Sequence, residues 1–236
     1  MNKLIIDNIS ELREVSIYEN KDILINLDNV NDNINITIGP NIKTRIDVLT
    51  TNSKNKTEIN VLENSEVVIN KLSCNNSDEI TINLNGENSS IVYNTGIINK
   101  KENIYKQVIN HNFSNTNSTI INHAVNISND DFTFDITASI PKDKINCNTN
   151  QDNKIINKGK GKNYIKPNLL VDNNLIYANH SAYIGGFNKE KVFYMMTRGI
   201  KKEQIEELLT IGFLLENEKL NKEEKEQREL FLKNNI

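Results

Sequence analysis

Residues 166–215 read KPNLLVDNNLIYANHSAYIGGFNKEKVFYMMTRGIKKEQIEELLTIGFLL. The stretch begins at one of three prolines, runs through an extended apolar segment at Leu169–Ala178 and turns at Gly185-Gly186. Before this turn the apolar residues alternate with polar ones, and after it they recur every three or four positions. We therefore expect a strand-rich domain over residues 1–186 and a helical domain over residues 187–236.

Upstream of this stretch, the sequence pattern predicts many short strands. Ile34, Ile36 and Ile38 alternate with polar residues and stop at Gly39-Pro40. The alternation returns at Ile46 and Val48, Ile59 and Val61, Val67 and Ile69, Ile80 to Leu84, and Phe132 to Ile136. Such runs, separated by Asn- and Gly-containing turns, predict half-buried strands of about four to six residues. The pattern suits a sandwich, a barrel or a solenoid equally, and the lack of a fixed repeat slightly disfavours a regular solenoid.

Composition limits the classes of protein that remain. The 236 residues suit one large all-β domain, or one domain with an appendage. Asn is abundant beside only nine Gly and three Pro, which indicates turns built on Asn, a residue that tolerates left-handed backbone. The net charge of -3 argues against a nucleic-acid partner. No apolar run suits a membrane span or a signal peptide, and two cysteines make no disulfide framework, so we expect a cytoplasmic protein.

The helical part should contain two helices and a charged tail. Asn188 is the expected N-cap of the first helix, and Gly199 stands where that helix should end. A second helix is expected from Lys202 to Leu215. Its apolar face would be lined by Ile205, Leu208, Leu209 and Gly212, with Phe213 adjacent. Charges of both signs alternate from Glu216 to Arg228, which predicts a solvated helix that frays.

Two motifs in residues 166–215 carry a resemblance to a known family. They are HSAYIG at residues 180–185 and FYMMTRGI at residues 193–200. In this order and spacing they resemble the signature of the SufB/SufD family, the scaffold subunits of the SUF iron–sulfur cluster assembly machine. Residues 115–118 and Gln151 also resemble family positions, so the similarity covers roughly Asn110 to Leu215.

The resemblance implies a mainly β fold, a right-handed parallel β-helix with a short C-terminal α-helical domain. The Ile, Val and Leu residues would fill its interior, and Asn would stand at its corners. Asn side chains can stack in ladders between coils and so satisfy buried amide groups. Family members often carry a helical N-terminal domain, for which this sequence leaves no room before its first strands.

The resemblance also implies a function, that of a non-catalytic scaffold subunit rather than an enzyme. Such a subunit would dock the SufC-type ATPase through its C-terminal helices. It would pair with a second copy or with a SufB-like subunit, and ATP hydrolysis would move the two subunits and open their shared interface. The implied partners include neither nucleic acid nor a membrane, and no stably bound cofactor is implied beyond a transient iron–sulfur cluster.

Three residues follow from the family pattern as cluster-assembly candidates: His180, Asp152 and Cys147. A neutral imidazole binds iron well, so His180 is the candidate metal ligand, and the alternative is a buried structural histidine. SufB-type proteins place Cys after the Gln at position 151 and Glu after the His, whereas Asp152 and Ser181 here are closer to the SufD-type pattern. Cys147 is a further acceptor for sulfur or iron, although an odd offset from Asp152 places it on the other face of a strand.

The helices supply the candidates for ATPase docking. Tyr194 and Arg198 are four positions apart and share one helical face. The remaining docking candidates are Ile205, Leu208, Leu209, Gly212 and Phe213. The alternative is that Phe193 and Phe213 are core residues that pin the helices to the strand domain. We expect both interpretations to hold, on different faces.

Two other functions stay open. A polysaccharide-acting β-helix enzyme would cluster acidic or basic side chains on one face of the coils. A plain structural or adhesive solenoid would not need the helix at residues 193–200. The chain contains no P-loop, G-x-S-x-G or H-E-x-x-H sequence. His111 and His123 are expected at the surface rather than as a metal pair, and Cys74 is expected in a turn without a partner.

Overall fold

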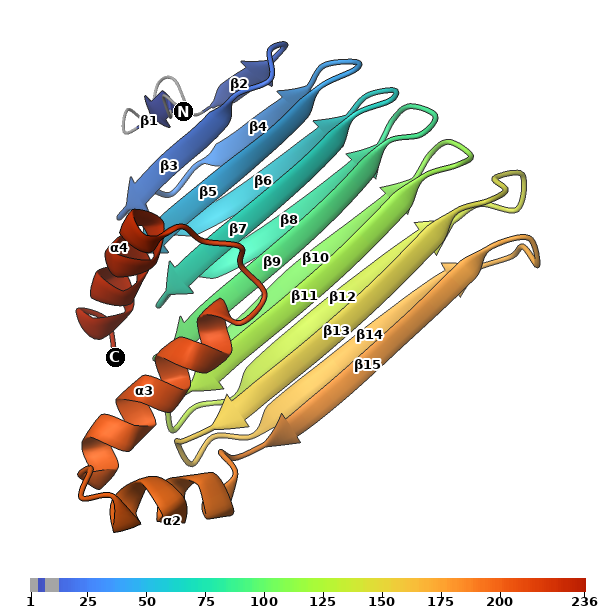
Figure 1. Cartoon of the computed structure of the whole chain (residues 1–236). Helices are drawn as coiled ribbons and strands as arrows, with labels where there is room; N and C mark the ends of the chain where they lie inside the picture. The colour runs from blue at the N-terminus through green and yellow to red at the C-terminus, as the bar shows by residue number, and fades with distance from the viewer. Residues whose placement is uncertain (1–3, 7–12) are drawn as a thin grey trace.

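The computed structural model describes residues 4–6 and 13–236 of the chain. Its strands form two parallel sheets, with the odd-numbered strands in sheet A and the even-numbered strands in sheet B. The chain therefore passes from one sheet to the other after each strand and winds into a β-solenoid of about six turns (Figure 1). The mainly β fold with C-terminal helices is confirmed.

The strands follow one another in chain order within each sheet. Sheet A contains β1 (Leu4–Ile6), β3 (Asp22–Asp28), β5 (Lys43–Thr51), β7 (Glu66–Cys74), β9 (Ser90–Asn99), β11 (Asn117–Asn126), β13 (Asn148–Asn157) and β15 (Tyr177–Gly185). Sheet B contains β2 (Glu14–Ile17), β4 (Asn33–Ile38), β6 (Lys54–Val61), β8 (Ser77–Leu84), β10 (Asn103–His111), β12 (Phe132–Ile140) and β14 (Asn163–Val171). The helices are α2 (Lys189–Thr197), α3 (Lys202–Leu215) and α4 (Lys222–Lys233).

The interior holds the residues that alternate in the sequence. Ile34, Ile36 and Ile38 are all almost fully buried, as are the matching residues of the later strands. Farther along the solenoid, Phe134 packs edge to face against Tyr105 and Phe132, with ring centroids 5.6 and 5.0 Å apart. Because each strand puts every second side chain inside, burial of these residues holds the two sheets together.

The expected strand length was wrong, and so was the impression that no repeat exists. The strands from β5 to β15 have eight to ten residues, because each coil spends only a few residues on its corners. From β3 to β8 the step is constant: Lys43 pairs with Glu66, and Asn52 lies beside Asn75, in both cases 23 positions on. The step then lengthens, reaching 31 between Asn115 and Asn146. This drift hides a repeat that the spacing of Asn29, Asn52 and Asn75 could have revealed.

The prediction of Asn-built corners is confirmed. Eight Asn residues have positive φ, namely Asn29, Asn41, Asn52, Asn64, Asn75, Asn88, Asn115 and Asn146. Asn reaches this backbone region more easily than other residues with a side chain. The corner side chains also bond from coil to coil, since the Asn75 amide donates to Asn52 at 2.7 Å and that of Asn88 to Asn64 at 3.0 Å.

The helices begin where the change of period predicted. β15 ends at Gly185, and the Asn188 side chain caps α2 by accepting from the N–H groups of Glu190 and Lys191. Gly199, with φ of 82°, follows the end of α2. Residues 13–186 and 4–6 contain no helix, while residues 1–3 and 7–12 lie outside the description. The division into two domains stays a prediction.

The helices lie along sheet A near the carboxyl ends of its strands (Figure 1). Ile211, Leu214 and Leu215 of α3 and Leu232 of α4 form a cluster with Leu72, Cys74, Ile98, Val125 and Ile156 of the sheet. Cys74 is therefore a buried residue at the end of β7 rather than a residue of the following turn. In the part of the chain that the structure describes, no helix has the length and hydropathy needed to cross a membrane.

The tail forms the expected helix and most of its residues are exposed, but the prediction that this helix frays was wrong. Asn221 caps α4 by accepting from the N–H of Glu224, and Leu232 is fully buried. Arg228 is 3% exposed because it reaches across to Asp47 on β5, at 2.9 Å. The alternating charges did not reveal this contact, because an arginine in such a run can pair with a carboxylate that lies far away in sequence, as Arg228 does with Asp47.

Candidate functional site

The last coil leaves the solenoid open at one end (Figure 1). β14 and β15 each have a strand neighbour on one side only, and β15 has no buried residue. Apolar side chains are exposed there, with Leu170 at 60%, Tyr177 at 61% and Ile184 at 47%. An unpaired edge with exposed apolar side chains invites the addition of another chain.

His180 lies on this edge and faces the interior side of sheet A. It pairs in register with Gln151, which is fully buried inside the solenoid. Since neighbouring residues point to opposite faces, Asp152 and Ser181 lie on the outer side, where the Ser181 hydroxyl donates to Asp152 at 2.5 Å. His180 itself is exposed, so the alternative of a buried structural histidine is wrong.

The three cluster-assembly candidates are not brought together within one chain. Cys147 is 1% exposed and immediately precedes β13, where Asn148 pairs with Tyr177. Its position is thus four residues, or roughly 13 Å, from that of His180 along the strand direction. Asp152 faces away from both. Within residues 4–6 and 13–236, no three His, Cys, Asp or Glu side chains are arranged to hold a metal ion.

A chain of buried polar side chains surrounds Cys147. His111 is fully buried and its two ring nitrogens lie 2.7 Å from the Thr116 hydroxyl and 3.0 Å from the Ser118 hydroxyl. Thr116 Oγ1 also lies 3.3 Å from Cys147 Sγ, and Ser118 donates to Thr149 at 2.8 Å. His111 is therefore an interior residue rather than the surface residue that was expected.

Acid should destabilise the fold through His111. Burial lowers the pKa of His111 from 6.5 to about 4, so the imidazole stays neutral in the folded protein. Between these pKa values the unfolded chain binds a proton that the folded chain does not, and stability is lost as pH falls from about 6.5 to 4. The loss should reach about 3 kcal/mol at about 1.4 kcal/mol per pKa unit. Urea denaturation of wild type and His111→Gln across this range checks it, and parallel curves would contradict it.

The predicted apolar face of α3 is divided in the structure. Ile205 is fully buried, whereas Leu208 is 51% exposed, Leu209 is half-buried and Gly212 is exposed. Phe213 turns toward the sheet and stacks on His123, with centroids 4.5 Å apart and planes at 6°. α3 contacts sheet A, α2 and α4, so a single apolar stripe does not describe it. Ile205 and Phe213 are internal, and Leu208 and Gly212 remain free to meet a partner.

Helix α2 is the most exposed element of the helical part. None of its residues is buried, and Phe193, Tyr194 and Met196 are 68%, 59% and 48% exposed. Arg198 donates to the Tyr194 hydroxyl at 3.0 Å and lies over its ring at 5.2 Å, which confirms that the two residues share a face. Phe193 does not pin the helices to the solenoid, because α2 touches α3 instead of the sheet core. An exposed apolar group of this kind typically marks a protein contact.

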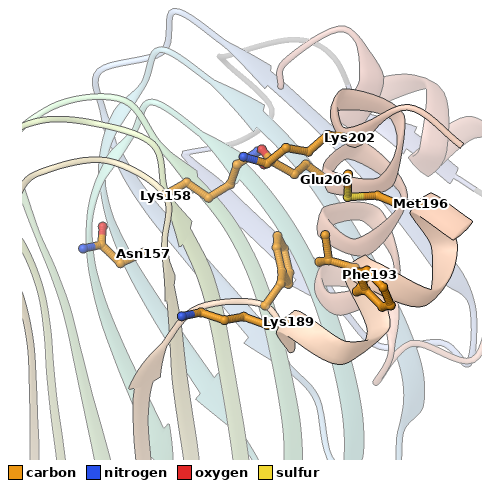
Figure 2. A pocket seen from close by; sticks show the side chains of 9 residues that line it. Asn157, Lys158, Lys189, Phe193, Met196, Lys202 and Glu206 are labelled. Atoms are coloured by element: carbon orange, nitrogen blue, oxygen red, sulfur yellow. The ribbon is translucent and has the colours of Figure 1, made fainter.

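A cavity of about 370 Å³ lies between α2, α3 and the end of β13 (Figure 2). Figure 2 shows Phe193 and Met196 beside three lysines, Lys158, Lys189 and Lys202. Glu206 neutralises part of this charge, since it lies 3.0 Å from Lys158 and 3.8 Å from Lys202. The cavity thus presents an apolar floor with a net positive rim, which suits an acidic and apolar segment of a protein.

Comparisons with known proteins agree with the motifs. The model of the family described as "SUF system FeS cluster assembly, SufBD core domain" matches residues 10–213. The iron–sulfur cluster assembly protein SufD of Bacillus subtilis (strain 168) is 28% identical over 130 residues, which are 55% of this chain. The match covers 29% of that relative's length. The family match also covers residues 10–109, upstream of the part in which the motifs carried a signal.

Proposed function

This chain belongs to the SufB/SufD family of the SUF iron–sulfur cluster assembly system, and on that premise we propose that it is a non-catalytic scaffold subunit of a cluster assembly complex. The observation that carries the proposal is the combination of a solenoid that is open at one edge with a helix, α2, that has no buried residue. A scaffold subunit that is moved by another protein needs one surface that binds that protein and a second surface that binds its partner subunit. The compartment we propose is the cytoplasm.

The partner at the helices, we propose, is the SufC-type ATPase. Its contact surface would be the docking face, which we define as Phe193, Tyr194, Met196, Arg198 and Leu208. These side chains are exposed. Phe193 and Met196 lie next to the positive rim of the cavity in Figure 2, whereas Leu208 lines a separate cavity between α3 and α4. Leu209 and Gly212 adjoin this face, whereas Ile205 and Phe213 support it from inside.

Aspartate at two positions of the docking face should remove ATPase binding without unfolding the chain. Phe193→Asp and Leu208→Asp put a charge where an apolar contact forms, and the unpaired charge should weaken binding by about 100-fold or more. Both side chains are more than half exposed, so the melting temperature should stay near that of wild type. A pull-down with the ATPase and a thermal melt of each variant test this together.

Ile205→Asp is the matched control for Leu208→Asp, because Ile205 lies on the same helix, α3, and is fully buried. It should lower the melting temperature, which Leu208→Asp should not. If both Phe193→Asp and Leu208→Asp retain full binding, the docking face is not where the ATPase binds. If Leu208→Asp alone retains binding, the contact is confined to α2.

The second partner would add to the open edge, either as a second copy or as a SufB-like subunit. The ladder begins with the Tyr177 N–H donating to the Cys147 carbonyl at 2.9 Å, so alternate residues of β15 direct their N–H groups away from β13. These are Ala178, His180, Ala182 and Ile184. On β14, the corresponding outward position is occupied by Pro167, which has no N–H. β15 is therefore the better strand for pairing.

Proline at Ala182 should prevent pairing while leaving the chain's own sheet intact. The Ala182 N–H points to the open edge, so its loss removes a donor only from the partner. Ser181→Pro is the control, since the Ser181 N–H lies on the β13 side and its loss should destabilise the last coil. Sedimentation of both variants, alone and with SUF partners, measures the outcome. Pairing that survives Ala182→Pro would show that another surface is used.

An iron–sulfur cluster would be cargo of this complex, not a resident cofactor. We propose that His180 contributes a ligand at the edge shared with the partner, because it is exposed there and imidazole suits iron. Asp152 faces the outer side of the sheet, and Cys147 is buried four positions away along the strand, so each would act only after a rearrangement of the last coil. A polysaccharide-acting enzyme is the weaker alternative, because the outer carboxylates of sheet B alternate with lysines, as in the pair Lys56–Glu79 at 3.2 Å.

A further inference from the structure

A polar network lies on the outer face of sheet A, under the end of α3. His123 of β11 is its buried member, with a side chain that is 1% exposed. Its Nδ1 lies 3.0 Å from the Phe213 carbonyl oxygen and 3.5 Å from a Glu216 carboxylate oxygen, while its ring stacks on Phe213. These contacts join β11 to the last turn of α3 and to the residue that follows it.

Lys154 extends the network from the helix to the open edge. Its Nζ lies 3.6 Å from Glu216 and 3.0 Å from Asp152, both on the outer side of the sheet. Asp152 in turn accepts the hydrogen bond from Ser181 of β15. The path therefore runs from Glu216 at the end of α3, through Lys154 and Asp152 of β13, to Ser181, the neighbour of His180.

Two basic side chains, Lys154 and His123, face Asp152, and Lys154 is the one that pairs with it. Because His123 Nδ1 donates to a carbonyl, the neutral ring leaves Nε2 without a proton, and Nε2 has no hydrogen-bond partner among the described residues. That nitrogen lies 3.9 Å from Asp152. Burial lowers the pKa of His123, and the charge of Lys154 lowers it further, against the opposing effects of the Phe213 carbonyl, Glu216 and Asp152. Displacing Lys154 would let a protonated His123 take its place.

We propose that Lys154 is a positioning residue that couples α3 to β15. Glu216, Lys154, Asp152 and Ser181, together with His123 below them, form this coupling network. The backbone ladder with β13 holds β15, which has no other strand neighbour. Two side-chain hydrogen bonds on the outer face add to this ladder, from Ser181 to Asp152 and from Asn179 to Asn150 at 3.2 Å. This coupling rests on the proposed function, in which the helices that include α3 dock the SufC-type ATPase and the edge strand β15 pairs with a second subunit.

The isolated full-length chain tests the coupling without any partner. Lys154→Met and Glu216→Gln should each make the protected amides of residues 177–185 exchange hydrogen about threefold faster or more. In Lys154→Met, the pKa of His123, followed by the ring resonances in NMR, should rise, because the nearest cation is gone and both carboxylates remain. Unchanged exchange in both variants, or an unchanged His123 pKa, would overturn the coupling.

Lys158→Met is the matched control. Lys158 also joins the end of β13 to α3, through Glu206 at 3.0 Å, but has no contact with β15 or His123 in the structure. It should leave both the exchange of residues 177–185 and the His123 pKa at wild-type values. Equal effects of Lys158→Met and Lys154→Met would mean that any helix–sheet bridge matters equally, and the specific coupling would be wrong.

Adding the SufC-type ATPase separates the two proposals. In wild type, binding should change the exchange of residues 177–185, and in Lys154→Met binding should persist while this response is lost. If wild type fails to bind the ATPase, the proposed partner is wrong, while the results on the isolated chain still decide the coupling. If the ATPase binds and Lys154→Met responds as wild type does, the coupling is wrong and the proposed partner stands.

Discussion

Replacing Arg228 with methionine should lower the free energy of unfolding by about 3–5 kcal/mol, the usual cost of removing one partner from a buried ion pair. The Arg228 side chain is 4% exposed, with Nη2 2.9 Å from Asp47 and Nε 2.8 Å from Glu218. The carboxylates of Asp47 and Glu218 are both buried, at 1% and 2% exposure. With Met at position 228, their negative charge would no longer be balanced by nearby positive charge. Arg45, 3.0 Å from Asp47, compensates only in part.

The loss should depend on pH. Burial raises the pKa of Glu218 to about 7, so this carboxyl is protonated in part near neutrality, and its neutral form is favoured in the folded state. A raised acid pKa gives stability at low pH that is lost as pH rises through about 7. Without Arg228 the ionised form becomes costlier still, and Arg228→Met should therefore be more destabilising at pH 8 than at pH 5.

Urea denaturation gives the free energy, and hydrogen exchange of residues 222–233 shows whether α4 detaches from the sheet. Lys225→Met is the control on the same helix, because Lys225 forms an exposed pair with Glu229 at 3.8 Å. Such pairs contribute about 0.5 kcal/mol or less. If Arg228→Met loses no more than Lys225→Met, then the ion pair does not hold α4 in place.

Replacing Asp78 with alanine should cost a similar amount, about 3–5 kcal/mol, inside the solenoid. Asp78 of β8 lies 2.9 Å from Lys71 of β7, and the two side chains are 1% and 4% exposed. The pair joins sheet B to sheet A among apolar neighbours, since Lys71 lies beside Ile59 and Ile69. Alanine would leave an ammonium group buried without its counter-charge.

The double variant Lys71→Met/Asp78→Leu is the comparison that separates the effect of the unpaired charge from the effect of lost packing. Removing both charges removes the desolvation cost as well, so most of the stability lost in Asp78→Ala should return. A double-mutant cycle in urea isolates the pair energy. If the double variant is as unstable as Asp78→Ala, the loss comes from packing at these positions rather than from the unpaired charge.

Local features of the chain were readable without coordinates because they depend on near neighbours in sequence. The alternation around Ile36 sets which side chains enter the core, and Asn at positions such as Asn52 sets the corners through its tolerance of positive φ. Asn188 and Gly199 mark the ends of α2 by the same kind of local chemistry. The motifs at residues 180–185 and 193–200 sufficed to suggest the family, and the family match then covered residues 10–213.

The contacts that define the candidate site depend on distance in space, and only the tertiary structure decided them. Arg228 and Asp47 are 181 positions apart. Glu216 meets Lys154 only because α3 packs along the outer face of sheet A. Ile205 and Leu208 are both apolar residues of one helix, yet one is buried and the other half exposed. A helical repeat says which side chains share a face, but burial is set by which neighbours cover that face, and those neighbours come from strands that were far away in the chain.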